Sequence, residues 1–220
     1  MDETSIPFSA FQEVLDFLPR AHPLRTDLLL LASTGARPSE LEHINDDDRN
    51  GQTLYWRCGK NQTGRWRRAT IPEWILAEVN EMRHTHRTRA GRFTVHNCAT
   101  LRRRFNKEVR PHLGPRWQEK QYLPFGNPVL RKNGQFLLEI KGFRKSYTST
   151  FFWRHWQKLG DCMAAVLFAQ TELRHSSYEV TAQHYLKELD TLEPERWDAF
   201  LRTDAPPLCA QTHLAEWLTL

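Results

Sequence analysis

A histidine and a tyrosine, His175 and Tyr185, stand ten positions apart near the C-terminal end of an arginine-rich chain. A buried core does not need this arrangement. An enzyme that cuts a phosphodiester through a covalent phosphotyrosine does, because it requires a hydroxyl nucleophile, an imidazole and cationic donors around one phosphate. Tyr185 is therefore the first candidate catalytic residue.

Two further short motifs place cations where they could reach a phosphate. Thr34-Gly-Ala-Arg37-Pro-Ser-Glu40 puts Arg37 at a break between helices, and Glu40, one turn later, could orient it. A purely structural Arg37–Glu40 pair is the alternative interpretation. Lys141-Gly-Phe-Arg144 spaces two cations three apart, so that both lie on one helix face.

The elements that must position these residues follow from the apolar spacing. It predicts an α+β, mainly α-helical fold in which a small antiparallel hairpin follows the first helices. A serine N-cap at Ser9 opens the first helix, and the second helix, about 25–33, is hydrophobic nearly all round and should be central to the core. A third helix starts at Pro38. The hairpin strands are 53–58 and 65–71, and further helices are expected at about 72–87, 99–109, 142–158, 162–173, 180–189 and 195–202.

Two other stretches have a recognisable composition. Residues 112–135, with three Pro and three Gly, predict an irregular connection or a second short hairpin. The aromatic run 150–156, which includes Trp156, is interpreted as core.

Composition bounds the class of protein. The chain has 220 residues, 40% of them hydrophobic, and a net charge of +5, which fits one large domain and favours a polyanionic partner. Arginines crowd the stretch 83–104, for which a solvated helix face is the alternative interpretation. Four scattered cysteines have no metal-ligand spacing and are interpreted as reduced thiols. We expect no metal or cofactor, no signal peptide and no membrane span, and a cytoplasmic, nucleoid-associated location.

The order of the motifs resembles the catalytic domain of the tyrosine recombinases (phage integrase family). Thr-Gly-Ala-Arg-Pro-Ser-Glu-Leu, a lysine-bearing hairpin, Lys-xx-Arg-Lys-Ser-Tyr and His-Ser-Ser…Tyr follow one another between about Pro7 and Leu189. The resemblance implies a catalytic domain over 1–205, without the family's N-terminal core-binding domain. The remaining residues, 206–220, form an amphipathic tail that could dock on a neighbouring protomer.

The resemblance also implies roles for individual residues. Tyr185 would attack the phosphate to give a 3′-phosphotyrosyl protein, while Arg37 and Arg144 bind the non-bridging oxygens and Glu40 supports Arg37. His175 would hydrogen-bond a phosphate oxygen, and Lys60 would protonate the leaving 5′-oxygen. Lys141 belongs to the same catalytic set. The predicted DNA contacts are Arg65, Arg67, Arg102, Arg103, Lys145 and Arg174.

The sequence departs from the family pattern at several positions. Lys141 stands where the family usually has His, Arg174 replaces a common Gly, and His184 rather than Tyr185 lies nine residues after His175. The expected function is a site-specific recombinase or integrase of a mobile genetic element, acting on double-stranded DNA as a dimer or tetramer. The alternatives are a recombinase-derived DNA-binding regulator and a relaxase-like nicking protein.

Overall fold

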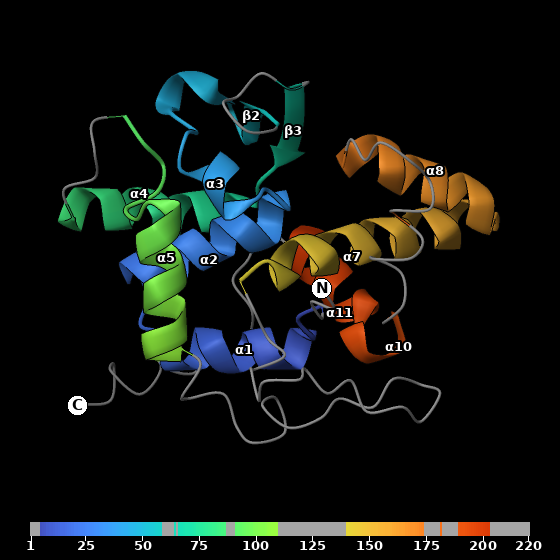
Figure 1. Cartoon of the computed structure of the whole chain (residues 1–220), viewed down its shortest axis with the longest axis horizontal. Helices are drawn as coiled ribbons and strands as arrows, with labels where there is room; N and C mark the ends of the chain where they lie inside the picture. The colour runs from blue at the N-terminus through green and yellow to red at the C-terminus, as the bar shows by residue number, and fades with distance from the viewer. Residues whose placement is uncertain are drawn as a thin grey trace.

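The computed structural model describes residues 5–58, 64, 66–86, 91–109, 140–173, 181 and 189–202, and shows a mainly helical chain with one small sheet (Figure 1). The helices are α1 (Phe8–Phe17), α2 (Pro23–Thr34), α3 (Pro38–Leu41), α4 (Glu73–Thr85), α5 (Cys98–Arg104), α7 (Gly142–Leu159), α8 (Cys162–Leu173), α10 (Leu189–Leu192) and α11 (Pro194–Arg202). A 3₁₀ turn, η1 (Asp46–Asp48), precedes the sheet, and a π-helical turn, η3 (Phe105–Val109), continues α5. The predicted fold class is confirmed.

The sheet has three antiparallel strands in the order β1 (Arg49–Asn50), β2 (Thr53–Arg57) and β3 (Trp66–Thr70). Leu54 and Trp56 of β2 face the core and pair with Ala69 and Arg67 of β3, so the alternation of buried residues continues across the pair. The hairpin was predicted. The short β1 was not, because its two residues lie in a segment whose Asn, Asp and Gly residues predict only a turn.

Helix α2 is the centre of the core. All of its residues are buried, as its nearly uniform apolar surface predicts. His22 caps its start by accepting a hydrogen bond from the Leu24 N–H, and Pro23 occupies the first turn. Gly35, at φ +59°, ends the helix in the left-handed conformation that favours glycine. The motif with Arg37 therefore begins where the best-buried helix ends.

An aromatic cluster joins the two ends of the described chain. Phe11 of α1 stacks on Trp197 of α11 with ring centroids 4.9 Å apart, and Phe143 of α7 meets Phe11 edge-on. The Trp197 indole N–H donates to the Ile6 carbonyl at 3.0 Å, and Ser146 of α7 exchanges hydrogen bonds with the same residue at 2.8 Å. These contacts fix the N-terminal half of α7 against α1, α2 and α11 (Figure 1).

Helices α7 and α8 form a hairpin that extends beyond this core (Figure 1). Phe152 packs with Ala165, Val166 and Ala169 in a separate small cluster. Trp156, interpreted as core, is instead 40% exposed, because the C-terminal half of α7 is covered mainly by α8. The prediction that the run 150–156 is buried is therefore wrong at this residue.

The predicted bounds of the described helices and strands are close to the observed ones, but one predicted helix cap is wrong. Ser9 was predicted as the N-cap of the first helix, but Pro7 holds that position and Ser9 lies inside α1. The Ser9 hydroxyl instead donates to the Glu193 carboxylate at 2.7 Å. Residues 112–135, most of 180–189 and all of 206–220 lie outside the described residues. Among the described helices, none is long and apolar enough to cross a membrane.

Candidate active site

Arg37 sits at the start of α3, two residues after the glycine that ends α2. Its backbone is extended and Pro38 follows at the first helical position, so the chain turns sharply there. The Arg37 side chain is 48% exposed, while Ala36, Pro38 and Glu40 are buried. The exposed guanidinium thus projects from a backbone that is held on both sides.

Glu40 holds both the backbone and the side chain of Arg37. Its carboxylate accepts a hydrogen bond from the Arg37 backbone N–H at 2.9 Å and another from the Arg37 guanidinium at 2.6 Å. Burial by itself would raise the pKa of this carboxyl. The hydrogen bond from the Arg37 N–H, together with the charges of Arg144 and Arg37, outweighs burial and leaves the pKa lowered. Glu40 is therefore an ionised, buried anchor.

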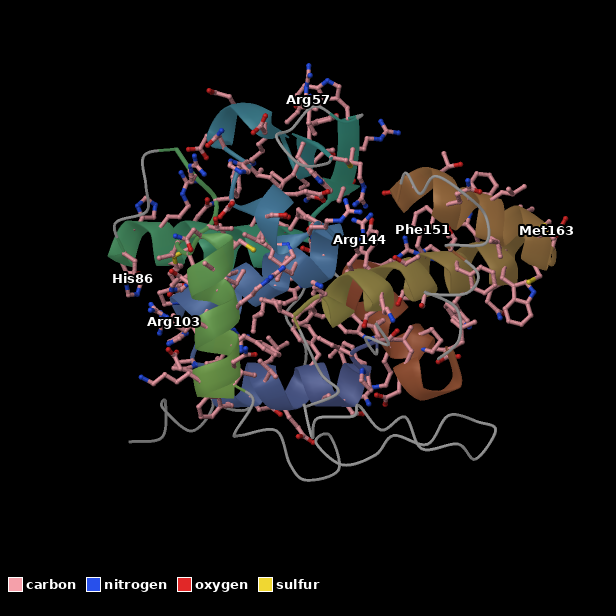
Figure 2. All side chains as sticks on the ribbon, viewed as in Figure 1. Arg57, His86, Arg103, Arg144, Phe151 and Met163 are labelled. Carbon is pink, nitrogen blue, oxygen red and sulfur yellow. The ribbon has the colours of Figure 1, made fainter. Side chains whose placement is uncertain are left out.

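Arg144 lies in the first turn of α7, where Figure 2 labels it. Its guanidinium is 6% exposed and donates to the Gly35 carbonyl at 2.8 Å, with the Glu40 carboxylate 3.9 Å away. Glu40 is thus shared between the two arginines that the sequence singled out. The structure brings Arg37, Glu40 and Arg144 together.

Arg67 is placed differently from the prediction. We expected a DNA contact, but the side chain is 1% exposed and points inward from β3, over the Trp56 ring. It donates to the carbonyls of Gly35 at 3.3 Å and Thr34 at 3.4 Å. The Arg67 guanidinium is held inside the fold by these two backbone carbonyls, and the predicted contact is corrected to a structural one.

Two described residues that are close in sequence to other catalytic candidates interact with Glu40 or Arg67. Cys58, at the end of β2, lies close enough to Glu40 that the carboxylate adds to the effect of burial in raising the thiol pKa. Glu172, in the last turn of α8, has its carboxylate 3.9 Å from Arg67. Lys60, Arg65, Arg174, His175 and Tyr185 themselves lie outside the described residues, so their roles stay predictions.

The other predicted site residues are on the surface or half-buried. Lys141 holds the N-cap position of α7 and Lys145 follows in its first turn, both partly buried. Arg102 and Arg103 are exposed on α5, where Figure 2 labels Arg103. Within the described part of the chain, no group of His, Cys, Asp and Glu side chains could hold a metal ion.

A cavity of about 400 Å³ has Tyr147 in its lining. Its lining includes Arg68, Phe151, Arg154 and Glu172, but not Arg37, Glu40 or Arg144. The candidate site therefore lies outside the cavity, and of its three side chains only Arg37 is exposed. An exposed cation of this kind suits a phosphate within a long polymer better than a small enclosed molecule.

Comparison with known proteins gives a fold. No protein-family model and no curated protein sequence matches the chain. Solved structures do match, among them the following two. The first is XerA recombinase, with a TM-score of 0.56 and 13% identity, covering 99% of this chain and 64% of that one. The second is a lambda integrase dimer bound to a COC′ core site, with a TM-score of 0.55 and 14% identity over 84% of this chain and 60% of that one.

The chain has the fold of tyrosine recombinase catalytic domains. It spans less than two thirds of the length of either similar structure. At this level of identity the likeness concerns the fold alone, and the chemistry must be argued from the residues.

Sequence reasoning missed the side chains that support the site. Arg67, Tyr147 and Glu172 all touch the Thr34–Gly35 turn or one another. The sequence could have indicated the burial of Arg67. Strand alternation places Arg67 on the same face as Ala69, and its partner across the two strands is the apolar Trp56. Glu172 and Tyr147 carried no such signal, because their partners come from other elements.

Proposed function

We propose that the chain is a site-specific DNA recombinase or integrase that cuts and rejoins strands through a 3′-phosphotyrosyl intermediate. The observation that carries the proposal is the exposed Arg37 guanidinium, held by the buried, ionised Glu40 beside Arg144, on a recombinase fold. A rigid cation in this setting can stabilise the charge that builds on a phosphate in the transition state without reorganising.

The step itself needs no external energy source. The Tyr185 hydroxyl attacks the scissile phosphorus and forms a 3′-phosphotyrosyl bond, releasing its proton to water. The bond to the 5′-oxygen breaks, and Lys60 gives that oxygen its proton. Arg37 binds the non-bridging oxygens together with Arg144, and His175 donates a hydrogen bond. Rejoining is the reverse attack by a 5′-hydroxyl, so the bond energy is conserved in the phosphotyrosine.

Double-stranded DNA is the proposed partner, and a dimer or tetramer on DNA is the proposed assembly. The lambda integrase to which the chain is similar is itself a dimer bound to a core site. Residues 1–205 would form the catalytic domain and 206–220 the tail that docks between protomers. Exposed Arg102 and Arg103 on α5 extend the cationic surface available to phosphates.

A DNA-binding regulator of recombinase descent is the second candidate. One observation favours it: Arg144 is buried and already donates to the Gly35 carbonyl, so fewer of its N–H groups are available to a phosphate. Lys141, in place of the family's His, points the same way. A relaxase-like nicking protein would share the chemistry of the first proposal but not its rejoining partners.

The deciding experiment uses duplexes of randomised sequence, nicked a few nucleotides 3′ of each candidate bond so that the cut is irreversible. The full chain should form a denaturant-stable protein–DNA adduct that can be sequenced. Tyr185→Phe should abolish the adduct, and the neighbouring His184→Ala should retain it. Binding of the pool without any adduct would replace the recombinase proposal by the regulator.

A further inference from the structure

We infer that Arg67 is a positioning residue that clamps the backbone turn carrying Arg37. The inference rests on the proposed function, because the turn matters most if Arg37 acts on a phosphate. It extends that function to a buried residue of β3 whose guanidinium donates to the turn itself.

The burial of Arg67 is not explained by packing. A buried guanidinium is costly unless its donors are paired, and the Nε of Arg67 has no hydrogen-bond partner among the described residues. An apolar side chain of similar size would fill the space over Trp56 at lower cost. The specific contacts of Arg67 must therefore account for its presence.

Those contacts converge on the end of α2. The last carbonyls of a helix have no partner within the helix. Here the Gly35 carbonyl accepts hydrogen bonds from Arg67 of β3 at 3.3 Å and from Arg144 of α7 at 2.8 Å. The Thr34 carbonyl accepts a further hydrogen bond from Arg67 at 3.4 Å. Two buried cations from different elements thus hold one turn, next to the negative end of the α2 dipole.

Tyr147 and Glu172 close the turn from the remaining side. The Tyr147 ring packs so tightly on Gly35 that an added Cβ would lie 2.5 Å from its Cδ1 atom. Burial and then the Glu172 charge raise the pKa of Tyr147 to about 12, so its hydroxyl stays protonated and can donate to Glu172. Glu172, 3.9 Å from Arg67, therefore links the ring and the cation.

Arg37 lies two residues beyond this clamp. Its backbone N–H is held by Glu40, but the direction of the peptide before it depends on Thr34 and Gly35. A misplacement of about 1 Å in a catalytic group can cost about 100-fold in rate. Loss of Arg67 should therefore slow strand cleavage while leaving DNA binding, which uses surface contacts, nearly intact.

The test compares Arg67→Met and Arg67→Lys with Arg68→Met. Arg68 is the matched control, because it is the adjacent residue of the same strand, carries the same charge and faces solvent. Single-turnover cleavage of the nicked duplexes should fall about 10- to 100-fold in Arg67→Met at saturating DNA, with an affinity within a few-fold of wild type. Arg67→Lys should recover part of the rate, because a lysine can still donate to one carbonyl. Arg68→Met should cleave at the wild-type rate.

Hydrogen exchange of the Arg37 amide, measured alongside thermal stability, provides a readout that does not need cleavage. In Arg67→Met, or in Arg67→Lys if the former does not fold, this amide should exchange faster than the change in global stability explains. The inference would be overturned if a folded Arg67→Met variant showed the wild-type exchange of the Arg37 amide and the wild-type cleavage rate. The recombinase proposal would still stand. If wild type forms no adduct, the recombinase proposal fails and the amide exchange alone decides the role of Arg67.

Discussion

Two arginine-rich regions of the molecule use their charges in opposite ways. Around the Gly35 turn, Arg37, Arg67 and Arg144 share two carboxylates, and Arg37 is left about half exposed. In the stretch 83–104, two of the arginines each have a carboxylate of their own. Arg83 binds Asp46 through two hydrogen bonds of 2.7 and 2.6 Å, and Arg104 binds Glu108 at 2.6 and 2.8 Å.

The second region also contains a chain of hydrogen bonds that joins Asp27, His96 and Arg104, here called the relay. Asp27 of α2, fully buried, accepts from the His96 ring at 2.7 Å, and the other ring nitrogen meets Arg104 at 2.8 Å. Because arginine can only donate, the nitrogen facing Arg104 must accept, which leaves the proton on the nitrogen facing Asp27. The difference teaches that the local density of arginine does not tell which guanidinium groups are paired with an acid. The placement of the carboxylates does.

The largest expected effect is a loss of stability when the buried carboxylate of the first region is removed. Glu40→Ala removes the buried partner of Arg37 and Arg144, and should lower the free energy of unfolding by about 3–5 kcal/mol. Asp46→Ala removes the exposed partner of Arg83 and should cost about 1 kcal/mol or less. Urea titrations of both variants measure the difference. Equal losses would show that the two regions do not differ in this way.

The next effect concerns activity. Arg37→Ala should reduce adduct formation on the nicked duplexes by about 10²- to 10³-fold, because it removes a preorganised donor from the transition state. Arg83→Ala, the same change in the other region, should leave the rate close to wild type. If both slow cleavage alike, the stretch 83–104 takes part in the chemistry.

A smaller loss is expected from the relay. Asp27→Asn keeps the shape of the side chain but cannot accept in full the hydrogen bonds from the Val95 and His96 backbone and from the His96 ring. The cost should be about 1–3 kcal/mol, measured by urea unfolding. Cleavage by the folded variant at saturating DNA should be unchanged, and a loss there would couple the relay to the site.

The smallest effect is a difference in the sign of a pH slope. Hydrogen bonding and nearby arginines hold the pKa of Glu40 below its usual 4.5, so its stabilisation is complete above that pH and disappears as pH falls through the lowered value. Burial raises the pKa of Asp27 above its usual 3.8, so ionisation costs stability as pH rises through the raised value. The gap in unfolding free energy between wild type and Glu40→Gln should therefore narrow toward acid pH. The gap in unfolding free energy between wild type and Asp27→Asn should narrow toward higher pH.

The elements could be predicted because their causes are local. The apolar surface of α2, the Pro38 start of α3 and the hairpin with its glycine loop are all written in adjacent residues, and each appears close to its predicted bounds. Errors arose where a distant partner decided the outcome. Ser9 meets Glu193 instead of capping its own helix, and Trp156 is exposed because α7 outruns the core.

By itself, the sequence determined the order of the motifs, and their resemblance to the tyrosine recombinases predicted that Arg37, Glu40 and Arg144 belong to one phosphate site. Only the tertiary structure decided how their charges are shared. Glu40 serves two arginines because α3 and α7 meet at the end of α2, and Arg67 turns inward because β3 pairs with a buried β2. The sequence does not show which charged side chain is buried, and burial is what separates Arg67, which holds the turn, from the exposed Arg37.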